Sequence, residues 1–121
     1  LHLIRHGMTA GNLQGLYIGS GTDLPLCDEG RAQLADLKER FAYPQVDTVF
    51  SSPLLRAVET ANILFPGAAH QFTVHDLREA GFGKFEGRPV KDHPRLRLCA
   101  RGCRADRAVP CPLRREPDEA V

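Results

Sequence analysis

The chain has 121 residues, of which 42% are hydrophobic and 26% charged, and its formal net charge is +1 at pH 7. This length predicts a single domain, and a net charge near zero gives no general argument for binding to nucleic acid or to a membrane surface. The apolar runs are too short to span a bilayer. The first residues also lack the charged and hydrophobic regions of a signal peptide, so we expect a cytoplasmic protein.

Residues 1–7 form an apolar run that leads into an arginine, a histidine and a glycine. This pattern predicts a buried strand with chemistry at its carboxyl end, because ligands of open α/β sheets bind at that edge. His6 can act as a neutral nucleophile near pH 7, and Arg5 can bind an oxyanion such as phosphate with two hydrogen bonds. A histidine that only hydrogen-bonds to a turn fits this stretch equally well.

The segment after Gly7, residues 8–26, is rich in glycine and small polar residues, which is typical of a loop that covers a bound anion. Asn12 could donate an amide hydrogen bond to such an anion. The glycines match neither the dinucleotide-binding fingerprint nor the P-loop. The segment therefore gives little support to a nucleotide-binding function.

Two helices are predicted next. In residues 28–41, an apolar face formed by Leu34, Leu37 and Phe41 indicates an amphipathic helix. Residues 46–52 predict a second strand. After it, we expect a helix that is capped by Ser52 and ends before Pro66.

Arg56 lies in the first turn of this second helix, off its apolar stripe. From there an arginine can reach the carboxyl edge of the sheet, where the positive end of the helix favours an anion. An isolated arginine at this position is more often solvated. Beside Arg5 and His6, a role as a phosphate ligand is favoured.

Residues 72–77 predict a third strand, and Glu79 follows it among glycines and the aromatic residues Phe82 and Phe85. A carboxyl group in such surroundings can act as the general acid that protonates a leaving group. A surface glutamate in a glycine-rich turn is the alternative. We predict no catalytic role for the histidines that lack comparable neighbours, which are His2, His70 and His75.

Three motifs at these strand ends together resemble the histidine phosphatase superfamily, also called phosphoglycerate-mutase-like. They are Leu-Ile-Arg-His-Gly over residues 3–7 with Asn12, Ser-Ser-Pro-Leu-Leu-Arg-Ala over residues 51–57 with Glu59-Thr60-Ala61, and Leu-Arg-Glu over residues 77–79 with a Gly-x-Phe-Glu-Gly tail. The resemblance implies a three-layer α/β/α sandwich of the phosphoglycerate-mutase-like type. We expect a domain that is incomplete at its C-terminal side, because the superfamily's second histidine, in a Ser-His-Gly-like motif, is not found after Glu79 in this sequence.

The resemblance also implies a role for each candidate residue. His6 is phosphorylated, Arg5 and Arg56 clamp the phosphoryl oxygens, Asn12 adds a contact, and Glu79 protonates the leaving alcohol. No metal or other cofactor is implied. Water then hydrolyses the phosphohistidine, so that the net reaction is phosphomonoester hydrolysis.

Residues 15–26 and 79–83 resemble the alpha-ribazole phosphatases of cobalamin synthesis more than the mutases. The expected partner is a small phosphorylated metabolite, with no nucleic acid and no membrane, and the oligomeric state stays open. The alternatives are a truncated, inactive fragment or phosphate-binding remnant, and phosphoryl transfer of the mutase type. Cys27 stands where the family usually has a threonine or serine before the Gly30 helix, so we expect that helix to lose its hydroxyl cap.

Residues 93–121 differ in composition from residues 1–92. They hold seven arginines, four prolines and three cysteines, with no helical or strand periodicity. Their cysteine spacing fits no zinc motif, and they lack aromatic residues for stacking on nucleic acid. We therefore expect residues 1–92 to form the N-terminal part of the domain and residues 93–121 to be a disordered tail, with a shift of reading frame as our hypothesis for its origin.

Overall fold

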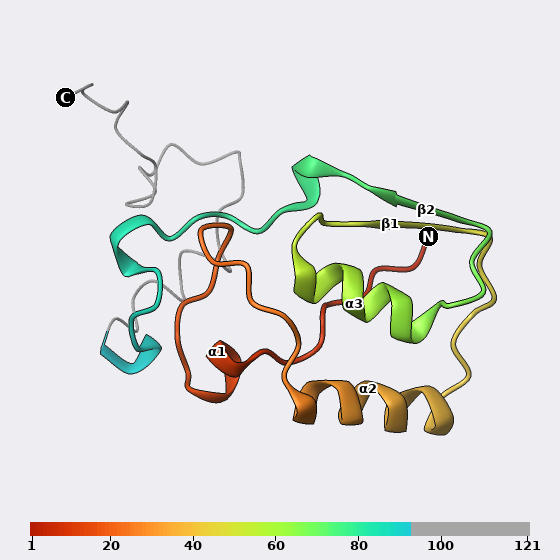
Figure 1. Cartoon of the computed structure of the whole chain (residues 1–121), viewed down its shortest axis with the longest axis horizontal. Helices are drawn as coiled ribbons and strands as arrows, with labels where there is room; N and C mark the ends of the chain where they lie inside the picture. The colour runs from red at the N-terminus through yellow and green to blue at the C-terminus, as the bar shows by residue number, and fades with distance from the viewer. Residues whose placement is uncertain (93–121) are drawn as a thin grey trace.

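The computed structural model describes residues 1–92, so the expectation of a disordered tail concerns residues outside the described part. In Figure 1 the sheet, α3 and α2 lie one below the other, and α1 lies to one side with the loops that follow β2. The elements, in chain order, are α1 (Ala10–Leu13), α2 (Asp28–Arg40), β1 (Thr48–Ser51), α3 (Leu55–Leu64), β2 (His70–Thr73) and the 3-10 turns η1 (His75–Leu77), η2 (Gly83–Phe85) and η3 (Val90–Asp92).

β1 and β2 are parallel, with Thr48 opposite His70 and Ser51 opposite Thr73. They are connected through α3, which packs on β1, as in a βαβ unit. The predicted third strand is shifted, since β2 ends at Thr73 and residues 75–77 form a 3-10 turn. The reason is that the backbone N–H of Val74 makes the last bond to Ser51, after which the chain leaves β1 to enter α3.

The hydrophobic core lies between α2 and α3. Leu26, Leu34 and Leu64 are buried there, and the predicted amphipathic helix over residues 28–41 is confirmed as α2. The expected position of Phe41 on the buried face is wrong, because the helix ends at Arg40 and the Phe41 side chain is 59% exposed.

The starts of the two helices differ from the expected caps. α3 begins at Leu55 rather than at Pro53, and the Ser52 hydroxyl accepts a hydrogen bond from the Leu54 N–H at 3.3 Å instead of capping the helix. The hydroxyl cap of α2 is absent, as expected, and the Cys27 thiol takes its role. Its Sγ accepts from the Gly30 N–H at 3.3 Å.

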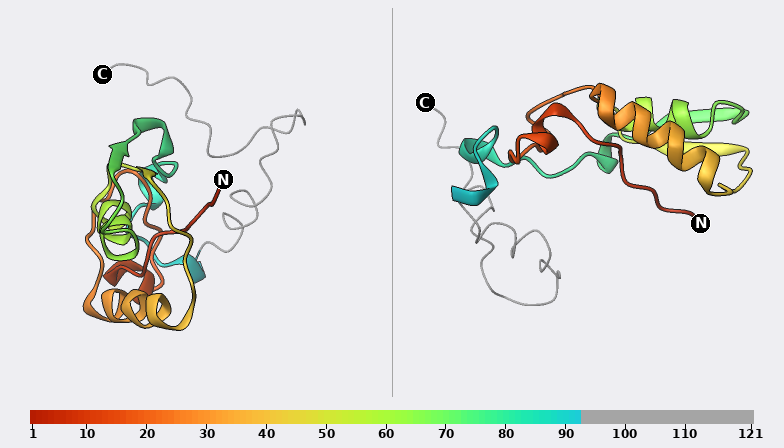
Figure 2. Two further views of the ribbon diagram at one scale, coloured as in Figure 1. Left: turned by 90° about the vertical axis from the view of Figure 1, so that its right-hand side faces the viewer. Right: turned by 90° about the horizontal axis from the view of Figure 1, so that it is seen from below.

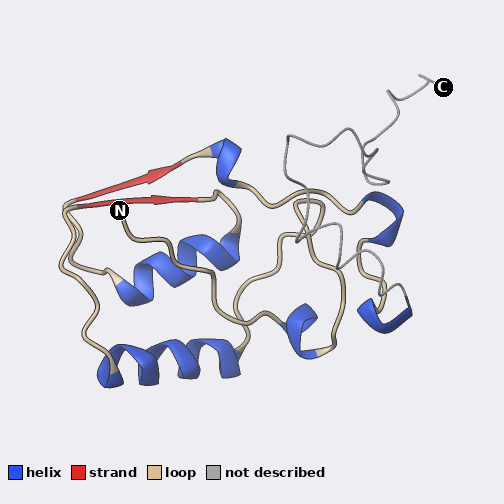
Figure 3. Cartoon of the chain, turned by 180° about the vertical axis from the view of Figure 1, so that it is seen from behind, coloured by secondary structure: helices blue, strands red, loops and turns tan. Residues whose placement is uncertain are grey.

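The predicted buried strand at the N-terminus does not form. Within the described part of the chain, residues 1–6 have no strand partner, and the side chains of Leu1 and Leu3 are exposed. Figure 2 shows this segment extending away from the helices, and Figure 3 draws it as loop. A strand needs a neighbour for its backbone groups and its apolar side chains, and residues 7–92 supply none.

Helix α3 packs on one face of the sheet, and α2 packs on α3. On the other face, the exposed rings of Phe50 and Phe72 stack with their centroids 5.6 Å apart. Within residues 1–92, both of these residues stay more than half exposed. The described chain therefore forms two of the three layers that the sequence predicts.

Candidate active site

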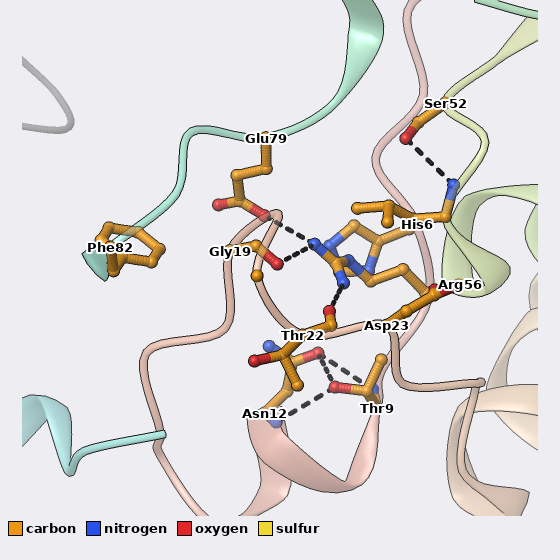
Figure 4. Close-up of polar contacts among 12 residues, drawn as sticks. His6, Thr9, Asn12, Gly19, Thr22, Asp23, Ser52, Arg56, Glu79 and Phe82 are labelled. Carbon is orange, nitrogen blue, oxygen red and sulfur yellow. Dashed lines mark hydrogen bonds and ion pairs between the residues drawn. The ribbon is translucent and has the colours of Figure 1, made fainter. Parts of the chain in front are cut away.

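A cavity of about 230 Å³ is lined by all five residues that the sequence singles out, which are Arg5, His6, Asn12, Arg56 and Glu79. They come from the N-terminal segment, α1, α3 and the segment after η1, and Figure 4 shows His6, Arg56 and Glu79 close together. The structure thus brings the whole predicted set to one place. None of His2, His70 and His75 lines this cavity.

The His6 ring has a defined hydrogen bond to the backbone of the next residue. Its Nδ1 lies 2.6 Å from the carbonyl oxygen of Gly7. Because a carbonyl can only accept, Nδ1 carries the proton and Nε2 keeps a free lone pair.

The surroundings of His6 favour the neutral ring. Burial is the main cause that lowers the pKa of His6 below its ordinary value of 6.5, and the hydrogen bond to Gly7 opposes this effect. The positive charges of Arg56 and Arg5 lower the pKa further, while Glu79 raises it. The ring is therefore an uncharged base at neutral pH.

Thr60 ties the segment that bears His6 to α3. Its hydroxyl accepts a hydrogen bond from the Gly7 N–H at 2.9 Å and donates one to the carbonyl of Arg56 at 2.7 Å. Sequence reasoning included Thr60 in a motif but gave it no role. The available signal was its position four residues after Arg56, which places both residues on one face of the helix.

Arg56 is buried, with only 2% of the residue exposed. Its guanidinium donates to the carbonyls of Thr22 and Gly19 at 2.9 and 3.2 Å and to Glu79 Oε2 at 3.3 Å. The sequence places Arg56 off the buried stripe of its helix, and the structure corrects this. Loop carbonyls satisfy the buried charge, which allows the guanidinium to stay out of water.

The other three candidates differ in how far their polar groups are already engaged within residues 1–92. Glu79 is half-exposed, with 44% of its side chain accessible, and it pairs with Arg56. The Asn12 Oδ1 accepts from the N–H and the hydroxyl of Thr9, which caps α1, so only its Nδ2 is left to donate to a ligand. Arg5 forms no ion pair with the rest of residues 1–92. It is the cation most readily available to a ligand.

Glu86 is a residue whose role sequence reasoning missed, although its motif was noted. Its carboxylate accepts hydrogen bonds from four groups at 2.8 to 3.2 Å, which are the N–H groups of Gly19, Gly21 and Phe82 and the hydroxyl of Thr22. Burial acts to raise the pKa of Glu86, but these donors outweigh it and hold the pKa below 4.5. Glu86 thereby fixes the loop whose carbonyls hold Arg56.

Residues 1–92 show neither a metal cluster nor a membrane-spanning helix. They contain no group of three or more histidine, cysteine, aspartate or glutamate side chains that could hold a metal ion. No helix in the same part of the chain is long and apolar enough to cross a membrane.

These features define a class of protein. A neutral imidazole can attack phosphorus, two guanidinium groups can neutralise the phosphoryl oxygens, and a carboxyl group can protonate a leaving oxygen. The site lies on an α/β scaffold in which helix α3 connects two parallel strands. The arrangement is that of an α/β protein with a site suited to phosphoryl transfer.

The comparison with known families identifies the class more closely. The model of the histidine phosphatase superfamily (branch 1) matches residues 1–111. The chain belongs to this superfamily, which confirms the resemblance seen in its motifs.

Two curated relatives illustrate the range of the superfamily. Fructose-2,6-bisphosphatase TIGAR B of Danio rerio is 39% identical over 98 residues, which cover 77% of this chain and 38% of the relative. Adenosylcobalamin/alpha-ribazole phosphatase of Salmonella typhimurium is 36% identical over 93 residues, which cover 76% of this chain and 46% of the relative. The chain thus spans less than half the length of these two relatives.

Solved structures agree with the fold. TTHB049 from Thermus thermophilus matches with a TM-score of 0.61 and 38% identity over 79% of this chain and 53% of that protein. YhfR of Bacillus stearothermophilus matches with a TM-score of 0.63 and 28% identity over 79% of this chain and 48% of that protein. The α/β fold of the phosphoglycerate-mutase-like type is confirmed, incomplete in the part described.

Proposed function

We propose that the chain hydrolyses a small phosphomonoester through a phosphohistidine on His6. The observation that carries this proposal is the 2.6 Å hydrogen bond between His6 Nδ1 and the Gly7 carbonyl, because it leaves the Nε2 lone pair for attack on phosphorus. The lowered pKa of His6 keeps that lone pair unprotonated at neutral pH.

In the first step, Arg5, Arg56 and the Nδ2 of Asn12 bind the phosphoryl oxygens. Nε2 of His6 attacks phosphorus as the bond to the leaving oxygen breaks, and Glu79 gives its proton to that oxygen. In the second step, the Glu79 carboxylate takes a proton from water as the water attacks the phosphohistidine. The P–N bond breaks, and inorganic phosphate and neutral His6 are released.

The 3.3 Å pair between Arg56 and Glu79 suits this sequence of steps. An entering phosphoryl group takes over the Arg56 contact and releases the Glu79 carboxyl group for proton transfer. Two loop carbonyls, those of Thr22 and Gly19, continue to hold the guanidinium. Arg56 therefore stays oriented when its bond to Glu79 is exchanged.

For the substrate, we propose alpha-ribazole 5'-phosphate as the first compound to test, which would place the protein in cobalamin synthesis. This choice is supported by the name of the Salmonella typhimurium relative and by the resemblance of residues 15–26. Hydrolysis rather than mutase-type transfer is supported by relatives with phosphatase names, among them putative phosphoserine phosphatase 2 of Hydrogenobacter thermophilus.

The test is to trap the intermediate. The full chain is mixed with para-nitrophenyl phosphate, quenched in alkaline detergent and analysed by mass spectrometry. We expect acid-labile phosphate on His6, its loss in His6→Ala, and turnover that EDTA leaves unchanged. His75→Ala is the matched control, since His75 is exposed and does not line the cavity. A wild-type chain without trapped phosphate, or His6→Ala as active as wild type, contradicts the proposal and favours an inactive remnant.

A further inference from the structure

The lining of the 230 Å³ cavity divides into two parts. One part is cationic and holds Arg5 and Arg56 beside His6. Figure 4 shows the Glu79 carboxylate between the Arg56 guanidinium and the ring of Phe82. The proton donor thus lies at the border with the second part, which is apolar and consists of Leu16, Tyr17, Ile18, Phe82 and Val90.

This apolar wall is held in place by the backbone of two segments far apart in the sequence. The N–H of Tyr17 donates to the carbonyl of Arg88 at 2.9 Å, the N–H of Gly87 donates to the carbonyl of Tyr17 at 2.8 Å, and the N–H of Val90 donates to the carbonyl of Gly15 at 2.8 Å. A surface built in this way is preorganised, because its shape is set before a ligand arrives.

Aromatic packing and Glu86 complete the wall. The rings of Tyr17 and Phe82 pack with centroids 5.1 Å apart at an angle of 48°. The carboxylate of Glu86 accepts from the N–H groups of both Phe82 and Gly19, so it joins the two segments at the edge of the wall.

Within the described part of the chain, the wall offers no charge to a second anion. Arg5 and Arg56 are the only lysine or arginine side chains that line the cavity within residues 1–92. Arg88 and Lys84 have other contacts, since Arg88 Nε donates to the carbonyl of Lys84 at 3.2 Å and Lys84 Nζ lies 5.5 Å from the centroid of the Phe85 ring. Lys91, which follows Val90, does not line the cavity. An anion in this half would be desolvated against apolar side chains without a counter-charge.

We propose that the wall is a subsite for an uncharged leaving group with an aromatic or other apolar face. The subsite disfavours phosphomonoesters whose leaving group carries a carboxylate or a second phosphate. This inference deepens the proposed function and rests on it for the assignment of the cationic half to the phosphoryl group.

The test uses binding, so that it does not depend on turnover. Phenylphosphonate and 4-carboxyphenylphosphonate share the phosphonate and differ by one carboxylate, and inorganic phosphate reports on the cationic half alone. By calorimetry on the full chain, we expect phenylphosphonate to bind about tenfold more tightly than either of the others. Equal affinities, tighter binding of the carboxylated compound, or no binding of phenylphosphonate overturns the proposal.

Variants locate the effect on the wall. Phe82→Ala should weaken phenylphosphonate binding about tenfold and leave the affinity for inorganic phosphate within about twofold. The affinity of Phe82→Leu for phenylphosphonate should lie between those of wild type and Phe82→Ala. Because leucine keeps an apolar side chain at this position, this variant serves as the test if Phe82→Ala does not fold. Phe41→Ala is the matched control, because Phe41 is exposed and away from the cavity. An equal loss for both ligands in Phe82→Ala and Phe82→Leu would show a merely structural role and refute the subsite.

The two proposals fail in different ways. Selective binding of phenylphosphonate without a phosphohistidine on His6 contradicts the proposed function and supports the subsite. A phosphohistidine on His6 without any preference between the two phosphonates contradicts the subsite alone.

Discussion

Residues 1–6 and the paired segments 15–22 and 79–90 both carry parts of the site, but they are held very differently. The first hydrogen bond from the N-terminal segment to a distant part of the described chain is made by Gly7 to Thr60. The paired segments are joined by several backbone bonds and by three donors to Glu86, which are the N–H groups of Gly19 and Gly21 and the hydroxyl of Thr22. The comparison teaches that the site depends on a few polar side chains between segments more than on the short sheet.

The largest effect is expected from Arg56→Ala, which removes the cation that joins the loop to Glu79. Losing its three hydrogen bonds should lower the free energy of unfolding by about 3 kcal/mol and kcat/KM by a factor on the order of 10³. Urea unfolding and phosphatase assays measure these changes. In the control Arg40→Ala, which loses only an exposed pair with Asp36, the cost should stay below about 0.5 kcal/mol.

Glu86→Ala is expected to loosen the paired segments and leave the sheet unchanged. The free energy of unfolding should fall by about 2 kcal/mol, since water replaces part of the lost hydrogen bonding. Hydrogen exchange should increase at residues 15–22 and stay unchanged at β1. The control is Glu39→Ala, at an exposed position in α2. Faster exchange at β1 as well would contradict a local role for Glu86.

The same variant has a pH signature. Because the folded-state pKa of Glu86 is depressed, its ionised form contributes stability above the ordinary pKa of about 4.5, and this contribution is lost as the pH falls through the lowered value. The difference in stability between wild type and Glu86→Ala should therefore shrink in acid. A difference in stability that is independent of pH would argue against stabilisation by the ionised Glu86 carboxylate.

Thr60→Val tests how weakly the N-terminal segment is held. Valine has the shape of threonine but leaves the Gly7 N–H without its acceptor, so we expect a loss of about 1 kcal/mol in stability. Because His6 moves relative to Arg56, kcat should fall about tenfold with KM nearly unchanged. Thr48→Val, at an exposed position of β1, is the control. If kcat stays at the wild-type value, Thr60 does not position His6.

The smallest expected effect concerns the titration of His6. The Cε1 proton of His6, assigned by comparison with His6→Asn, should titrate with a pKa below 6.5 in an NMR experiment. Since the unfolded state then binds more protons than the folded state, stability should decline as the pH falls below about 6.5. A midpoint at or above 6.5 would show that the ring is not shielded as the structure describes.

Local patterns predict much of the fold. The period of apolar residues places α2 within one residue of its observed end, and the expected cap at Ser52 places α3 within two residues of its start. Local patterns fail where contacts with a distant segment determine the secondary structure. Residues 1–4 have the composition of a buried strand but no neighbour within residues 1–92, and β2 ends where β1 turns away.

The sequence by itself determined the family and the five candidate residues, because each motif is a short run whose residue types state its chemistry. Their catalytic roles stay a prediction. Only the tertiary structure decided four features of the site. They are the burial of Arg56, the hydrogen bonds by which Glu86 clamps two segments together, the protonated nitrogen of His6 and the apolar wall next to the cations. The clamp and the wall join segments more than sixty residues apart, and local periodicity carries no information about such contacts.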